Sequence, residues 1–106
     1  SEQLSQSQIF FMLYNNKILF MNINELIAIV KNKLEAKIVI QDIKIEDKTF
    51  LHKNHKSHQD GRFHLKLIIN SNELSKISRI ASTKRIYNIL DLELKDHIHS
   101  IQILLN

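Results

Sequence analysis

The amino-acid sequence predicts an α+β domain with the element order α-β-β-α-α-β, in which a three-stranded mixed sheet carries its helices on one face. Three observations lead to this prediction. Apolar residues recur at helical spacing near residue 30, alternate between residues 63 and 69, and return to helical spacing after residue 71. A chain of 106 residues suits one such domain with a single core.

The first predicted helix covers residues 24–35. Asn22 stands three residues before Glu25, which is the spacing of a capping box at a helix N-terminus. The expected buried stripe follows at intervals of three and four residues and consists of Ile23, Ile27, Val30 and Leu34. Lys31 and Lys33 flank this stripe, so we expect the opposite side of the helix to face water.

Two strands are expected next, joined by a long connection. Residues 37–46 are rich in isoleucine, but these isoleucines change parity between Ile40 and Ile43, which requires a bulge or a late strand start. The second strand has the clearest period of two, with an apolar side made of Phe63, Leu65, Leu67 and Ile69. Its alternation places His64 on the opposite, polar side, where we expect it to be exposed.

The last part of the chain is expected to hold two helices and a final strand. Helical spacing predicts a short helix near residues 74–80 and a longer one over residues 82–94. A polar turn at residues 96–100 precedes the alternating residues Ile101, Ile103 and Leu105, which predict a strand. The solvated acidic face expected late in the longer helix consists of Asp91, Glu93 and Asp96.

Composition narrows the chemistry. There is no cysteine, so a disulfide and a thiol nucleophile are excluded, and any metal must bind His, Asp or Glu. The net charge of +4 permits a nucleic-acid or acidic partner without requiring one. No apolar run has the length of a membrane span, so no membrane partner is expected. We expect residues 1–20 to be a poorly ordered extension and residues 21–106 to be the folded domain.

Four of the six histidines lie between residues 47 and 65, in a largely polar stretch. His52, His55 and His58 are three residues apart, unlike the pair four residues apart on a helix in zinc hydrolases. A closed structural zinc site takes four ligands, so we expect His55 and His58 to be solvated. His97 is expected at the surface. The sequence shows no nucleophile with a matching base and no glycine-rich phosphate loop, so we expect no enzyme.

Three stretches of the sequence resemble motifs of the BolA-like family. DKTFLH at residues 47–52 is similar to the family's D-E-S-x-x-H, FHLKLII at 63–69 to its H-F-x-V-x-V-V strand, and IHSI at 98–101 to its V-H-A-L motif. The residues that match a fourth signature, R-H-R-x-V-Y, are Lys84, Ile86 and Tyr87. The chain departs from the family at Arg62, which replaces a histidine, and at residues 72–76, which lack the F-x-G segment.

The resemblance implies a fold like that of class II KH domains and a partnership with a monothiol glutaredoxin. Such a pair shares a two-iron two-sulfur cluster in cluster trafficking, cluster assembly or iron sensing. By position, the implied ligands are His99 of the V-H-A-L motif and His52 of the loop, with His55 as the alternative to His52. The chain alone would be a monomer without a cluster and would form a heterodimer with the glutaredoxin. BolA-like proteins occur in the cytosol and in organelles, so the compartment, cytoplasmic or mitochondrial, stays open.

A nucleic-acid-binding transcriptional regulator is the alternative function. Some BolA-like proteins are described as transcriptional regulators, and two consecutive helices resemble a helix-turn-helix in outline. The basic residues that could contact DNA phosphates are Lys76, Arg79, Lys84 and Arg85. They are not clustered with side chains that read bases, and the helix connection lacks the glycines of a KH loop. A solvated basic face is the simpler interpretation.

Overall fold

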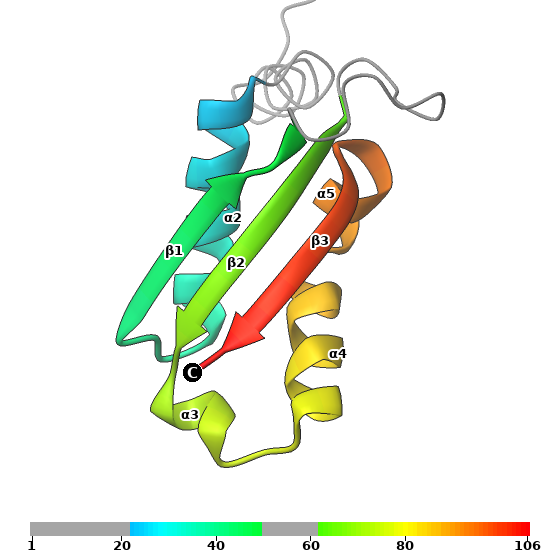
Figure 1. The fold of residues 1–106 in the computed structure, drawn as a ribbon. Helices are drawn as coiled ribbons and strands as arrows, with labels where there is room; N and C mark the ends of the chain where they lie inside the picture. The colour runs from blue at the N-terminus through cyan, green and yellow to red at the C-terminus, as the bar shows by residue number, and fades with distance from the viewer. Residues whose placement is uncertain (1–21, 50–61) are drawn as a thin grey trace, which may run out of the picture.

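The computed structural model describes residues 22–49 and 62–106. The described elements are, in chain order, α2 (Ile23–Lys37), β1 (Asp42–Asp47), β2 (Phe63–Asn70), α3 (Asn72–Ser75), α4 (Arg79–Ile89), α5 (Asp91–Asp96) and β3 (Ile98–Leu105). The strands form one sheet in the order β1-β2-β3, and Figure 1 shows the helices gathered on one side of it. The predicted α+β class is confirmed. The expected extension at residues 1–20 and three of the loop histidines lie outside the described residues, namely His52, His55 and His58.

Helix α2 begins where the capping box predicts. Asn22 Oδ1 accepts a hydrogen bond from the Glu25 N–H at 2.9 Å, and Asn22 Nδ2 donates to the Glu25 carboxylate at 3.0 Å. The buried stripe consists of Leu26, Val30 and Leu34. The stripe is rotated toward Leu26, and Ile27 is only half-buried. Because both residues are large and apolar, the helical period alone does not show which of them faces the core. The helix ends two residues later than predicted, at Lys37.

The sheet is mixed, as the sequence predicts. β1 and β2 pair antiparallel, with Ile43 opposite Ile69, and since directly paired residues share a face, both point toward the helices. The isoleucines change parity because the strand starts late. β1 begins at Asp42, whereas Ile38 is the C-cap of α2 and is buried. β2 and β3 pair parallel, which requires the long crossover that α3, α4 and α5 provide.

The core lies between the sheet and the helices. Its buried apolar side chains are Leu26, Val30, Leu34, Ile38, Leu65, Leu67, Ile69, Leu74, Ile86, Leu90 and Ile98. Full burial of each such side chain stabilises the fold by about 1.5–3 kcal/mol relative to exposure. Each described element except β1 has one of these buried residues, either within the element or as its capping residue. The helices and the sheet therefore form one packed unit.

The crossover contains three helices rather than the predicted two. Leu90, with φ −98° and ψ 18°, lies outside the helical region and separates α4 from α5. The prediction of one continuous helix over residues 82–94 is therefore wrong, and its predicted start is three residues too late. Within residues 22–49 and 62–106, no helix is both long enough and apolar enough to cross a membrane.

Serine side chains set the starts of the two helices that follow β2. The Ser71 hydroxyl accepts the Leu74 N–H at 3.1 Å at the start of α3, and the Ser78 hydroxyl accepts the Ala81 N–H at 3.1 Å at the start of α4. α3 is a single turn, shorter than predicted. The other two residues assigned to its apolar side are exposed, Ile77 by 42% and Ile80 by 71%.

The other face of the sheet carries more polar residues, and no helix of the described chain covers it (Figure 1). Residue pairing places on it Lys44, Glu46, His64, Lys66, Ile68, Ser100, Gln102 and Leu104. Most of these positions follow the expected alternation. The exception is the point where β3 begins.

Candidate functional site

The candidate site is an irregularity in the pairing of β2 with β3. Phe63 pairs with Ile98. Its neighbour His64 pairs with Ser100, so His99 is one extra residue on β3. Such a β-bulge redirects the extra side chain and interrupts the ladder. His99 is exposed at this bulge although Ile98 before it is buried, so the predicted ligand presents its imidazole at the surface.

His64 lies beside His99 and is buried, with only 6% of its surface exposed. Its Nδ1 is 2.6 Å from the Ser100 hydroxyl oxygen, which is hydrogen-bond distance. Its ring centroid is 5.0 Å from that of His99, with the two planes at 60°, an edge-to-face arrangement. The prediction of an exposed His64 is wrong: the residue is buried, and its ring contacts a residue 36 positions later in the chain, which the alternation of a single strand does not report.

The backbone of His64 joins this site to the end of β1. The Lys48 N–H donates to the His64 carbonyl at 2.7 Å, and the His64 N–H donates to Thr49 Oγ1 at 3.1 Å. The Thr49 N–H donates in turn to Asp47 Oδ1 at 2.9 Å. His52, the second predicted ligand, lies outside the described residues but follows Thr49 by three positions.

His97 has the opposite environment, although it is close in sequence to the bulge. Only 4% of it is exposed, its N–H donates to the Glu93 carbonyl at 2.8 Å, and its carbonyl accepts from the Phe63 N–H at 2.8 Å. Burial is the largest effect on the His97 pKa and lowers it; Asp96 and Glu93 oppose this and Arg62 adds to it. Nε2 has no hydrogen-bond partner within the described chain. The prediction of a surface histidine is wrong, because His97 is buried between the end of α5 and the start of β3.

Glu93 is also buried, contrary to the expected solvated acidic face. Only 1% of it is exposed, and its carboxylate accepts two hydrogen bonds from Lys33 Nζ, at 2.7 and 3.0 Å. A buried carboxylate requires such a partner because desolvation penalises an unpaired charge. The pair holds α5 against α2, and the prediction stands only for Asp91 and Asp96, which are exposed.

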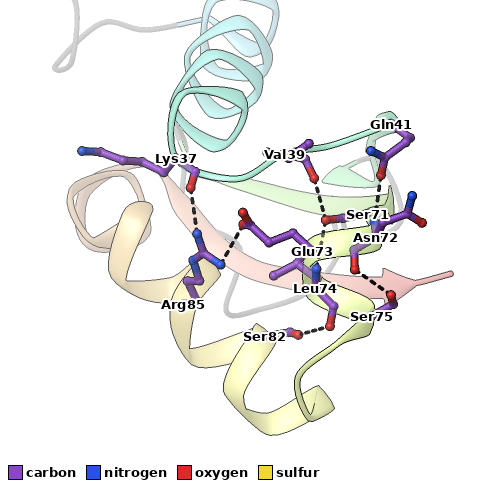
Figure 2. Close-up of polar contacts among 10 residues, drawn as sticks. All are labelled: Lys37, Val39, Gln41, Ser71, Asn72, Glu73, Leu74, Ser75, Ser82 and Arg85. Atoms are coloured by element: carbon purple, nitrogen blue, oxygen red, sulfur yellow. Dashed lines mark hydrogen bonds and ion pairs between the residues drawn. The ribbon is translucent and has the colours of Figure 1, made fainter.

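Arg85 of the predicted basic face has a structural role. Figure 2 shows its guanidinium between two groups, with NH1 2.8 Å from the Glu73 carboxylate and NH2 donating to the Lys37 carbonyl at 2.8 Å. Arg85 thereby ties α4 to α3 and to the last turn of α2. The other members of the predicted face are exposed, namely Lys76, Arg79 and Lys84.

The surroundings of the bulge are basic and open. A shallow hollow of about 220 Å³ on the helix-free face is lined by Lys48, Lys66, His64, Ser100 and Gln102, among others. Lys48 is paired with the Glu46 carboxylate at 3.5 Å, so Lys66 is the lysine that favours a negatively charged group there. Within residues 22–49 and 62–106, no three His, Cys, Asp or Glu side chains gather to hold a metal ion.

These features define a class of protein: a small α+β domain with a three-stranded mixed sheet that presents an exposed histidine on a strand bulge. The model of one family, described as BolA-like protein, matches residues 34–106. The chain belongs to the BolA-like family.

Solved BolA structures share the fold. The BolA domain of SufE1 from Arabidopsis thaliana is 26% identical, with a TM-score of 0.62, and the match covers 73% of this chain and 85% of that one. BolA1 from Arabidopsis thaliana is 22% identical, with a TM-score of 0.64 and coverage of 74% and 87%. A Bol-like protein from Babesia bovis is 14% identical, with a TM-score of 0.58 and coverage of 74% and 79%. No curated protein sequence matches the chain.

Proposed function

We propose that this chain is a non-enzymatic partner of a monothiol glutaredoxin and shares a two-iron two-sulfur cluster with it, in cluster trafficking, cluster assembly or iron sensing. His99 is one ligand and His52 is the other. The observation that carries the proposal is the exposed imidazole of His99 at the bulge, in a chain of the BolA-like family.

The chemistry of the chain fits a shared cluster better than a cluster of its own. Iron–sulfur clusters take thiolate ligands, and imidazoles replace two of them in one known variation that raises the reduction potential. The sequence has no cysteine, so the thiolates must come from the partner. Lys66 beside the bulge offsets part of the negative charge that thiolates and sulfides bring.

The proposal takes the second imidazole from the connection between β1 and β2. Thr49, at the start of this connection, is hydrogen-bonded to His64, whose ring contacts His99. His52, three positions after Thr49 in the sequence, is the residue proposed to supply the second ligand. His99 and the loop histidine would occupy two positions on one iron, and this chain would bind and orient the cluster while the partner completes it.

The test is reconstitution with a purified monothiol glutaredoxin, iron and sulfide. The wild-type chain is expected to give a heterodimer with visible absorption and circular dichroism that the glutaredoxin alone does not show. His99→Ala should remove this signature at unchanged thermal stability, because an exposed side chain contributes little to the fold. Asn88→Ala, an exposed change on α4, is the control. Wild-type spectra from His99→Ala would contradict the ligand assignment.

Binding of nucleic acid is a second candidate, favoured by one observation. Lys76, Arg79 and Lys84 are exposed around the start of α4, and none forms an ion pair within the described chain. Phosphate contacts of this kind give an affinity that falls steeply with salt. A salt titration of binding to duplex DNA tests it, and the absence of binding even at low salt would remove this candidate.

A further inference from the structure

We infer that His64 is a positioning residue, whose buried imidazole holds the His99 ring in the orientation that meets the metal ion. The inference rests on the proposed function for the identity of that ion. The contact between the two rings, the burial of His64 and the bulge are properties of the chain alone.

His64 is fixed on several sides. Its backbone N–H and carbonyl are both bonded to the end of β1, through Thr49 and Lys48. Its Nδ1 meets the Ser100 hydroxyl at 2.6 Å, and 94% of the residue is removed from water, since 6% is exposed. These contacts and the burial restrain the orientation of the His64 imidazole.

His99, in contrast, is an exposed side chain on the one residue that the β2–β3 ladder skips. An exposed imidazole on a bulge has freedom about its side-chain bonds, and a ligand that must be ordered at binding loses affinity. The edge-to-face contact with His64 restricts that freedom. Because Ser100 directly follows His99, His64 contacts both the bulged residue and its neighbour.

Histidine suits position 64 better than the longer side chains of the same face. A lysine, as at position 66, would extend its ammonium group into water. An imidazole contacts the ring of His99 and has a nitrogen for Ser100. Groups around metal ligands that fix ring orientation in this way commonly change metal affinity by about 10–100-fold when removed.

The first test uses the isolated chain. Side-chain couplings of His99, measured by nuclear magnetic resonance, give its rotamer populations. One dominant rotamer is expected in the wild type and in His64→Phe, which keeps an aromatic ring. His64→Ala should populate at least one more rotamer, and Ser100→Ala, an exposed change that leaves no buried cavity, should do so partly. Free averaging of His99 in the wild type, or unchanged rotamers in both alanine variants, overturns the inference.

The second test uses the complex with the glutaredoxin. Loss of the cluster to a chelator is expected to be about tenfold faster with His64→Ala than with the wild type, and His64→Phe should stay within about twofold. Leu74→Ala, which opens a cavity at the far end of the sheet, controls for lower stability and should keep the wild-type rate. Equal rates for His64→Phe and His64→Ala would overturn the role of the ring. If the wild-type chain forms no cluster-bearing complex, the proposed function fails, and the rotamer measurement still decides the role of His64.

Discussion

Polar groups in the helix layer and at the bulge end of the sheet are arranged in opposite ways. In the helix layer, Glu93 and Glu73 each meet a basic side chain from another element, Lys33 and Arg85. At the bulge end, the imidazole of His99 lies at the surface. The difference teaches that pairing between elements, rather than residue type, distinguishes the charged side chains that hold this fold together from an exposed one such as His99.

The largest effect is expected from breaking the ion pair between Lys33 and the buried Glu93. Lys33→Ala leaves the Glu93 carboxylate buried without its cation, which costs about 3–5 kcal/mol for a fully buried pair. Because Lys33 is 33% exposed, we expect a smaller loss of about 2–3 kcal/mol in the free energy of unfolding, measured by urea denaturation. Lys31→Ala is the control, since its pair with Glu35 is exposed and 4.0 Å long, and should cost less than about 0.5 kcal/mol. Equal losses would contradict the assignment of Glu93 as a structural residue.

A smaller effect is expected at the second pair. Arg85→Ala removes the ion pair with Glu73 and the hydrogen bond to the Lys37 carbonyl, both only partly buried, and should lower the free energy of unfolding by about 1 kcal/mol. Arg79→Ala, exposed on the same helix, should change it little. The comparison predicts that neither variant alters the spectrum of a reconstituted glutaredoxin complex. A loss of that spectrum in Arg85→Ala alone would show that the helix layer also takes part in binding the glutaredoxin.

The pH dependence of stability sharpens the contrast between neighbouring histidines. Burial lowers the pKa of His97 below its ordinary value of 6.5, so the unfolded chain takes up this proton more readily than the folded one. The contribution of His97 is therefore complete above pH 6.5 and is lost as the pH falls through the folded pKa. His97→Phe, which keeps a ring, should lose less stability between pH 7.5 and pH 5.5 than the wild type in urea denaturation. An identical loss in both proteins would show that protonation of His97 does not limit the fold.

The smallest effect is expected from the lysines beside the bulge. Lys66→Gln removes one charge from the rim of the hollow, and rim charges act mainly on association rates and are screened by salt. Binding of the glutaredoxin should weaken about two- to threefold at low salt and be unchanged near 0.5 M salt. Lys44→Gln, on the adjacent edge strand of the same face, is the control. A loss of affinity that persists at high salt would instead indicate a direct contact between Lys66 and the glutaredoxin.

Local patterns predicted most of the fold. The capping residues of α2, the period of β2 and the change of parity before β1 are all short-range signals, and each corresponds to an element of the structure. The break at Leu90 was not predicted, because the apolar spacing continues through it without a glycine or proline.

The candidate site was predicted only in part, for a physical reason. His99 was named through a family resemblance, whereas the bulge that exposes it depends on the register between β2 and β3, which no local pattern reports. His64 and His97 were both assigned to the surface, because alternation describes one strand and not what a distant strand or helix places over it. Glu93 was misassigned for the same reason, since its partner Lys33 lies 60 positions earlier.

The two hydrogen bonds that fasten Lys48 and Thr49 to His64 have an evolutionary consequence. They fix both ends of the connection between β1 and β2, so its length is decoupled from the register of the sheet. Doubling a flexible connection adds only about 0.6 kcal/mol of closure entropy. Insertions and deletions in this connection can therefore change its sequence at little expense to the fold. A single inserted residue in β3, by comparison, would turn every following side chain to the wrong face.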